Sequence, residues 1–275
     1  MAIITLTSDI GHTDYLPGAI KGKLLAILKN PVIADITHEL EPFNMLQAAY
    51  MCRNAFWHYP QHTYHIVIAN LFDLQSTTMM IAKDNGQYIF CADNGLVEMI
   101  LKRPPEIAVK LNPLKPENNK VLSVTTAFAK AIQQLENDLN IEEIGQIKTD
   151  FIAYNLFKPV IGNNWIERPI IFIDKFENVI VDITEAEFEE QRGGRDFQII
   201  FRRNEFIDKI SNTYADVNLG DKAAIFNSAG YLEIAINKGN AAGLFGLKSF
   251  SEFQQHSIIP TMMYQTIKIN FINEK

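Results

Sequence analysis

In the first 150 residues, short apolar runs alternate with segments in which apolar side chains recur at helical spacing. Residues 3–7, 32–36 and 64–69 have the β-rich composition of strands, whereas residues 15–28 and 44–58 have helical spacing. Pro17 lies near the start of the first helical segment, and Asn44 is suited to cap the second. Strands that alternate with helices predict an α/β domain with a largely parallel central sheet whose faces are covered.

The pattern continues with a hairpin. Residues 79–83 and 88–92 are two apolar runs on either side of Asp84-Asn85-Gly86, which supplies the left-handed positions that a tight turn needs. We then expect a helix over 95–102, a strand over 106–111 and an amphipathic helix over 126–139. The α/β pattern ends near Asp150.

From about Trp165 onward, strands dominate. We expect them at residues 169–174, 179–183, 197–201, 223–227, 231–236 and 266–272. Thr184 and Glu187 form a capping box for one short helix, and Asn227 to Gly230 is a turn signal between two apolar strands. This half predicts a smaller, mainly antiparallel β domain, so we expect domains at residues 1–155 and 160–275.

Composition and charge limit the kinds of molecule that the protein is expected to bind. The 275 residues carry 25 basic and 32 acidic side chains, a formal charge of −7, and no run rich in Lys or Arg, which disfavours nucleic acid as a partner. An acidic residue appears by Asp9 and no stretch of about 18 apolar residues occurs, so we expect no membrane association and a cytoplasmic protein. Cys52 and Cys91 fit buried, reduced thiols.

Common catalytic signatures, including phosphate-binding loops, zinc-protease helices and nucleophile elbows, are absent from the sequence. Polar residues instead follow the predicted strands: Asp9 and Asp14 after the first, Asn70 and Asp73 after the third. An open α/β sheet places its ligand crevice at such strand ends. Asp9, with Gly11 beside it, could accept two hydrogen bonds from a ribose diol, or it could be a helix cap or turn former.

Other candidates leave alternatives open. His38, in Asp35-Ile-Thr-His38, could serve acid–base chemistry or tie a loop. The six histidines are scattered without metal-ligand spacing, so we expect no metal site. Trp57 and several phenylalanines could stack on a purine or belong to the core: Phe43, Phe172 and Phe176.

Several segments together resemble one family. They are Thr7-Ser-Asp-Ile-Gly-His-Thr-Asp14, Asp35-Ile-Thr-His-Glu39, Ala92-Asp-Asn-Gly-Leu96, Ile173-Asp-Lys-Phe-Glu-Asn-Val179 and the C-terminal block from Asn227 to Ala242. In order and spacing they are similar to the S-adenosyl-L-methionine (SAM) hydroxide adenosyltransferases, which are related to SAM-dependent fluorinases and chlorinases. The resemblance covers nearly the whole chain.

The resemblance implies roles for individual residues. It places Asp9 on the ribose hydroxyls, Asp14 near the methionine head group and Asn178 on the adenine edge. It places Phe43 and Phe176 against apolar faces of the ligand, and Asp174 and Ser228 on its polar parts. It also implies a small nucleoside ligand with no separate cofactor, SAM being substrate or ligand. In that family the site lies between the α/β domain of one subunit and the β domain of its neighbour in a trimer, so we expect a homotrimer.

The sequence departs from the family where water would be activated. The family hydrolases use an Asp–Arg–His set, and the matching positions here are Asn70, Thr77 and Ser123. An amide cannot take a proton from water at neutral pH, and a threonine carries no positive charge. The catalytic residues are therefore unassigned, with Asp73, joined by His38 or Ser123, as one possible substitute.

Three functions follow. The family reaction is hydrolysis of SAM to adenosine and L-methionine, in which water attacks the ribose C5′ and the sulfonium departs. The alternative is a catalytically impaired protein that senses or sequesters SAM or adenosine. SAM-dependent halogenation is a third reading, which Asn70 and Asp73 do not favour because they offer an anion no positive charge.

Overall fold

The structure is a computed structural model that describes residues 1–72, 78–112, 120–151, 160–202, 205–247 and 265–272. The chain divides into two compact units, residues 1–154 and 155–275. Each unit has its own sheet, and the first unit has an apolar core on each face of its sheet.

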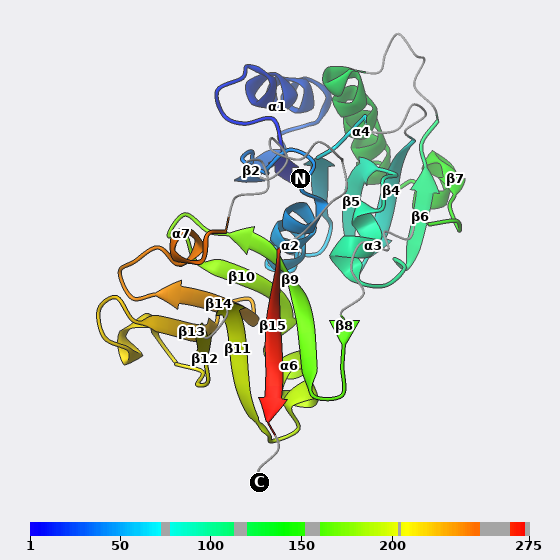
Figure 1. Ribbon diagram of the computed structural model, residues 1–275. Helices are drawn as coiled ribbons and strands as arrows, with labels where there is room; N and C mark the ends of the chain where they lie inside the picture. The colour runs from blue at the N-terminus through cyan, green and yellow to red at the C-terminus, as the bar shows by residue number, and fades with distance from the viewer. Residues whose placement is uncertain (73–77, 113–119, 152–159, 203–204, 248–264, 273–275) are drawn as a thin grey trace. The chain divides into compact units, whose positions relative to one another are not determined.

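The first unit is built on a mixed seven-stranded sheet in the order β2-β1-β3-β5-β4-β6-β7 (Figure 1). Its strands are β1 (Ile3–Ser8), β2 (Val32–Thr37), β3 (Thr63–Ile68), β4 (Met79–Asp84), β5 (Gln87–Ala92), β6 (Ile107–Lys110) and β7 (Gln146–Ile147). Strands β2, β1, β3 and β5 are parallel, and the other three pair antiparallel. The prediction of parallel strands in this half is thereby confirmed.

Helices cover both faces of this sheet (Figure 1). The helices α1 (Leu16–Ile27), α4 (Val121–Glu136) and α5 (Ile141–Ile144) share one apolar core with Ile66 and Ile68. On the other face, α2 (Met45–Phe56) and α3 (Leu96–Leu101) pack on Val67 and Ala69. Alternate residues of β3 thus enter opposite cores, which is why this strand shows a continuous apolar run.

Two local predictions in this unit had different outcomes. Asn44 caps α2, since its side chain accepts a hydrogen bond from the Gln47 N–H at 3.1 Å. The amphipathic helix expected from residue 126 begins at Val121 instead. Thr125 and Thr126 are accommodated within α4 because their hydroxyls donate to the carbonyls of Val121 and Leu122, four residues earlier in the helix. Threonine otherwise favours helix ends, where its hydroxyl bonds to free backbone groups.

The second unit is an antiparallel sheet in the order β12-β11-β15-β9-β10-β14-β13, with β8 added on β9. Its strands are β8 (Val160–Ile161), β9 (Trp165–Ile173), β10 (Val179–Thr184), β11 (Asp196–Arg202), β12 (Glu205–Ile207), β13 (Lys222–Phe226), β14 (Tyr231–Ile236) and β15 (Thr266–Ile272). A bridge between Ile210, just after β12, and Ala224 of β13 joins the two ends of the order. The sheet is therefore nearly a barrel, and the prediction of a mainly antiparallel β domain is confirmed.

The helix α6 (Glu185–Arg192) begins with the predicted capping box of Thr184 and Glu187. A further helix, α7 (Ala241–Phe245), and a 3₁₀ turn, η2 (Tyr214–Asp216), were not predicted. Their signals are local caps, such as Asn240 accepting from the Gly243 N–H, because they are too short to show an apolar period.

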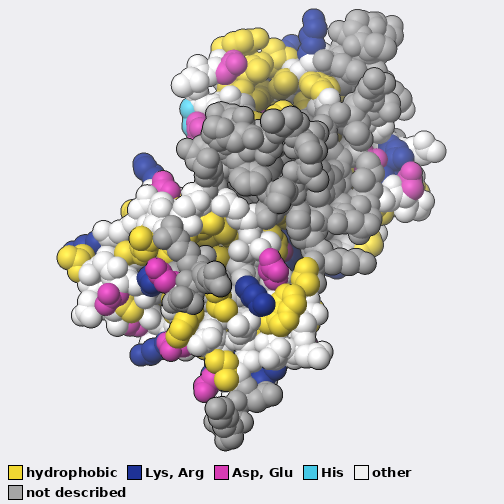
Figure 2. Space-filling model, in the orientation of Figure 1, with side chains coloured by type: hydrophobic (Ala, Val, Ile, Leu, Met, Phe, Trp, Pro, Cys, Tyr) yellow, Lys and Arg dark blue, Asp and Glu magenta, His cyan; other side chains and the backbone are white. Residues whose placement is uncertain are grey.

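Charged side chains of both signs are interspersed on the face of the molecule shown in Figure 2. Among the helices of the described residues, none combines the length and the apolar character needed to cross a membrane.

Candidate functional site

Polar side chains gather where the parallel strands of the first unit end. Ser8 ends β1, Thr37 ends β2, and Asn70 and Asp93 closely follow β3 and β5. Because these strands are parallel, their carboxyl ends lie along one edge of the sheet, where α/β proteins place ligands.

Asp9 is the central group of this edge. It is half-buried, and its Oδ2 accepts a hydrogen bond from the Asn70 N–H at 2.8 Å. Burial raises the pKa of Asp9, although the backbone hydrogen bond from Asn70 acts in the opposite direction. Lone pairs remain on both carboxylate oxygens, so Asp9 can accept further donors.

The turn at Asn70, which holds Asp9, is itself fixed by a neighbouring side chain. Asn70 has a left-handed backbone with φ of 48°, a conformation that asparagine tolerates better than most residues. The side chain of Asn94 donates to the carbonyls of Ala69 and Asn70 at 3.2 and 3.3 Å. Asn94 thus fixes the turn from which the Asn70 N–H reaches Asp9.

His38 joins the loop after β1 to the loop after β2. Its Nδ1 lies 2.7 Å from the Ser8 hydroxyl, and its carbonyl accepts from the Gly11 N–H at 2.7 Å. The Glu39 carboxylate accepts from the His12 N–H at 3.0 Å. The His38 side chain is only 1% exposed, so these contacts show it tying the two loops.

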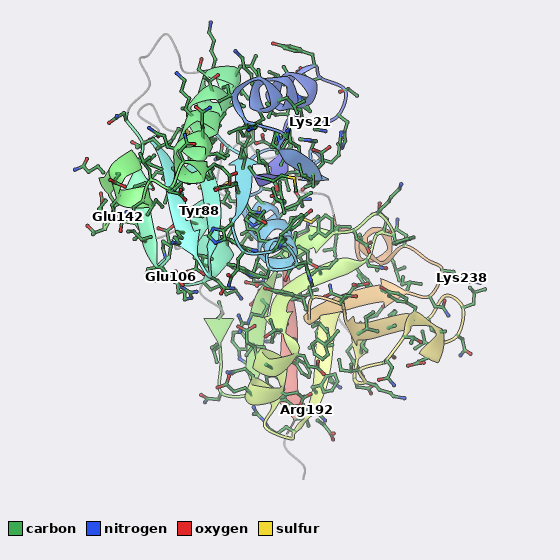
Figure 3. All side chains as sticks on the ribbon, turned by 180° about the vertical axis from the view of Figure 1, so that it is seen from behind. Lys21, Tyr88, Glu106, Glu142, Arg192 and Lys238 are labelled. Atoms are coloured by element: carbon green, nitrogen blue, oxygen red, sulfur yellow. The ribbon has the colours of Figure 1, made fainter. Side chains whose placement is uncertain are left out.

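A line of charged and polar groups runs from α1 to Ser8. Lys21, labelled in Figure 3, pairs with Asp35 at 2.6 Å, and Asp35 lies 3.2 Å from His38 Nε2. Burial acts to raise the pKa of Asp35, but the hydrogen bonds and charges of Lys21 and His38 outweigh it and lower the pKa. The line ends beside Asp9 and keeps the adjoining backbone in place.

Asp14 and Phe43 lie on exposed loops of the same unit. Asp14 Oδ1 accepts from the Leu16 N–H at 3.0 Å, at the start of α1. Phe43 is 52% exposed, with φ of 65°, directly before the cap of α2. A large apolar side chain held in the open at this point is suited to contact a ligand or another chain.

The positions that match the family's water-activating set are only partly described. Asn70 contacts Asp9 through its backbone N–H, and Ser123 lies in the first turn of α4. Among the described residues, no hydrogen bond joins Ser123 to Asp9 or Asn70. Thr77 and the possible substitute Asp73 lie outside the described residues.

A buried ion pair follows β5 and was not predicted. Lys148 Nζ lies 2.9 Å from Asp93 Oδ2, and the two side chains are 1% and 10% exposed. The ring of Phe151 lies 5.1 Å from the same ammonium group. The pair anchors the segment after β7 to the turn that contains Asn94.

In the second unit, the predicted residues Asp174, Phe176 and Asn178 share one turn between β9 and β10. Asp174 Oδ1 accepts from the N–H groups of Phe176 and Asn178, each at 2.8 Å. Phe176 is 76% exposed, whereas Asn178 is 5% exposed. The turn therefore presents an aromatic ring to solvent beside a buried amide.

The structure separates Ser228 from this turn. Strand β10 pairs antiparallel with β14, so that Val179 faces Ile234 and Thr184 faces Tyr231. Asn178 precedes one end of β10, whereas Ser228 lies on the β13–β14 turn, whose Gly230 carbonyl accepts from the N–H of Glu185 at the other end. The strand is irregular between Ile180 and Thr184, and the facing residues of β14 are only three apart, so Asn178 and Ser228 lie at opposite ends of a strand pair roughly 10 Å long.

A hollow of about 380 Å³ lies at the opposite edge of the first sheet from Asp9. Its lining includes Arg53, Trp57, Asp84 and Arg103. Arg103 makes two 2.8 Å bonds to Asp84, and Arg53 Nε donates to the Ile100 carbonyl, so these cations already bind protein groups. We therefore place the candidate site at Asp9, on chemistry, and not in this hollow. No group of three metal-ligating side chains occurs within the described parts of the chain.

The sequence analysis missed two residues that hold site residues in place, Glu233 and Asn94. Glu233 is a charged residue within an apolar strand, and its partner Asn178 is 55 residues away in sequence. Asn94 follows a strand, and its partners Ala69 and Asn70 are 25 and 24 residues away. Spacing alone does not identify such partners.

Two domain models of one family together match most of the chain. Residues 4–145 match the model of the SAM hydroxide adenosyltransferase N-terminal domain, and residues 168–254 match that of the C-terminal domain. The chain is 26% identical over 266 residues to the (R)-S-adenosyl-L-methionine hydrolase of Methanocaldococcus jannaschii, covering 92% of this chain and 95% of that protein. It is 23% identical to a fluorinase of Actinoplanes sp., covering 90% and 95%.

A crystal structure of an uncharacterized conserved protein from Thermotoga maritima is similar with a TM-score of 0.76. That match covers 98% of this chain and 100% of the other at 21% identity. At this identity the likeness shows a shared fold.

Proposed function

The chain belongs to the SAM hydroxide adenosyltransferase family, and on that premise we propose that it binds a ligand containing an adenosine unit, either SAM or adenosine. The observation that carries the proposal is Asp9. A half-buried carboxylate with a raised pKa lies at the carboxyl edge of a parallel sheet, fixed on one side by the Asn70 N–H.

A ribose diol is the natural partner of such a carboxylate. Two vicinal hydroxyls can donate to its two oxygens, and hydrogen bonds to an ionised acceptor are stronger than neutral ones. Asp9 is already partly desolvated in the folded chain, so a ligand has less water to remove from it than from a fully exposed carboxylate. Part of the cost of burying the charge is thus incurred on folding and not on binding.

The other residues are proposed to contact the rest of the ligand. Asp14 binds the amino end of the methionine, Phe43 and Phe176 cover apolar faces, and Asn178 contacts the adenine edge. Asp174 holds the Asn178 turn, and Ser228 contacts a polar group distant from the adenine. The separation of Ser228 from Asn178 along β10 fits an elongated ligand such as SAM better than a lone base.

The reaction that family membership favours is hydrolysis of SAM. Water attacks the ribose C5′, the C5′–S bond breaks, methionine leaves with the bonding pair, and the proton of water passes to solvent. The sulfonium is a good leaving group, so positioning contributes part of the rate. Asn70 offers no carboxylate as proton acceptor, so we propose that this step is slow here.

The alternative function is a protein that senses or sequesters SAM or adenosine. The amide at Asn70 favours it, because binding residues remain while a water-activating group is replaced. Halogenation has less support, although a fluorinase is among the relatives, because Asn70 offers a halide no positive charge.

We also propose that the chain is a cytoplasmic homotrimer. The exposed rings of Phe43 and Phe176 belong to different units, and each presents apolar surface that a neighbouring subunit and a ligand could cover. Light scattering coupled to size-exclusion chromatography measures the mass, and a monomeric protein at micromolar concentration contradicts this part of the proposal. The buried thiols of Cys52 and Cys91 fit a reducing compartment.

The binding proposal is tested by titration calorimetry with adenosine, SAM and 2′,3′-dideoxyadenosine. We expect adenosine and SAM to bind, and the dideoxy compound to bind at least about 100-fold more weakly because it lacks both donors to Asp9. Equal affinity for adenosine and its dideoxy analogue contradicts the assignment of Asp9.

A further inference from the structure

The Asn178 amide is held by two carboxylates. Its Nδ2 lies 3.0 Å from Glu233 Oε1 and 3.2 Å from Asp174 Oδ2. Carboxylate oxygens accept hydrogen bonds, so the nitrogen of the amide, and not its oxygen, must face them. The orientation of this amide is therefore determined by its chemistry.

Glu233 is held in place from the opposite side. On β14, Leu232 and Ile234 point into the apolar core, so Glu233 points to the other face of the sheet, where it is only 4% exposed. The Tyr214 hydroxyl donates to Glu233 Oε1 at 2.6 Å. Burial and the hydrogen bond to Glu233 raise the pKa of Tyr214, which keeps this hydroxyl protonated as a donor.

The side-chain oxygen of Asn178, unlike its nitrogen, is left to bind a ligand. Within the described residues no hydrogen bond uses its Oδ1. Nor is Oδ1 among the fully buried side-chain atoms that lack a hydrogen bond within the described residues. The amide thus retains an accessible acceptor and no available donor.

We propose that Glu233 is a positioning residue that makes Asn178 an acceptor-only contact, so that the site selects purine nucleosides carrying a 6-amino group over those carrying a 6-oxo group. This inference rests on the proposed function and specifies its ligand class. A 6-amino group donates to Asn178 Oδ1, whereas a 6-oxo group directs a second acceptor at it. Two facing acceptors leave both without a donor, which weakens binding.

The experiment is titration calorimetry of the full-length protein with adenosine and with inosine, its 6-oxo counterpart. We expect the native protein to prefer adenosine by at least about tenfold, the effect of one misplaced polar group. In Glu233→Gln the glutamine amide can donate to Asn178 Oδ1 and permits the asparagine to flip. The preference should therefore fall to within about threefold, mainly because inosine gains affinity.

Two matched variants separate positioning from general loosening. Tyr214→Phe removes a hydrogen bond from the same cluster but leaves the Glu233 carboxylate, so the adenosine preference should persist. Glu189→Gln alters an exposed carboxylate on α6 and should change neither affinity. Circular dichroism and thermal unfolding confirm that each variant is folded. If Glu233→Gln is unstable, Glu233→Asp is measured as well, and because it keeps a carboxylate at this position it should retain the adenosine preference.

The outcomes distinguish this inference from the proposed function. Equal binding of adenosine and inosine by the native protein overturns the inference but leaves nucleoside binding intact. An unchanged preference in Glu233→Gln, or an equal loss in Tyr214→Phe, also overturns it. Absence of binding by both nucleosides refutes the proposed function and the inference together.

Discussion

Replacement of Asp9 separates its two possible roles, as a ribose acceptor and as a turn former. Asp9→Ala removes both: the acceptor for a ligand diol and the acceptor of the Asn70 N–H at 2.8 Å. Asp9→Asn keeps an oxygen for the Asn70 N–H but loses the charge and half of the acceptor capacity. The pair of variants therefore assigns any loss to the ligand or to the loop.

The expected magnitude follows from the hydrogen bonds concerned. Two hydrogen bonds to a charged acceptor contribute about 3–6 kcal/mol together, so Asp9→Ala should weaken adenosine binding by about 100- to 10,000-fold. Loss of the acceptor also leaves the Asn70 N–H unpaired, which costs about 1–3 kcal/mol of folding stability. Relief of a half-buried charge offsets part of that cost.

The assay is titration calorimetry with adenosine, accompanied by urea unfolding of each protein. We expect Asp9→Asn to keep native stability while losing at least about tenfold in affinity. If Asp9→Asn binds as the native protein does and only Asp9→Ala fails, Asp9 acts as a turn former and the ribose assignment is refuted.

Four further predictions concern pH, catalysis, stability and the methionine end of the site. Because the pKa of Asp9 is raised, adenosine affinity should begin to fall at a higher pH, on acidification, than it would with an ordinary aspartate. The ligand-free protein should gain stability from this group as the pH falls through the same range. An adenosine affinity that stays constant in calorimetry down to the usual aspartate pKa contradicts this. Asn70→Asp combined with Thr77→Arg should raise adenosine release from SAM, measured by chromatography, and an unchanged rate shows that restoring these two side chains does not restore catalysis. Lys148→Met leaves Asp93 buried without its cation and should cost about 3–5 kcal/mol in urea unfolding, largely recovered by adding Asp93→Leu; a loss below 1 kcal/mol, about the effect of a surface pair, argues against a buried pair. Asp14→Ala should weaken SAM binding and spare adenosine, and equal losses for both compounds place Asp14 elsewhere.

Much of the fold could be predicted because its signals are local. The alternation of apolar runs and helical spacing indicated the strands β1, β2 and β3 and the helices between them, and Asn44 and Thr184 cap the predicted helices. Short elements such as α7 and β12 were missed because three to five residues show no period. The start of α4 was misplaced because its threonines bond back to the helix backbone.

The site was harder to predict, for a different physical reason. Strand ends identified Asp9 and Asn70 as candidates, and the structure joins them by a hydrogen bond. What holds the candidate residues of each unit in place depends on contacts distant in sequence, such as Ser8 with His38 in the first unit and Asn178 with Glu233 in the second. A spacing pattern indicates that Glu233 is unusual in an apolar strand, but only the folded sheet shows which amide it orients.

The central claim is that the chain binds an adenosine-containing ligand, SAM or adenosine, through Asp9. The most direct measurement is incubation of the purified protein with SAM, followed by rapid filtration and chromatography of the retained and free fractions. The account predicts that SAM is retained with the native protein, that adenosine appears slowly, and that Asp9→Ala abolishes both. Native protein that does not convert SAM and retains neither SAM nor, in a parallel incubation, adenosine contradicts the account.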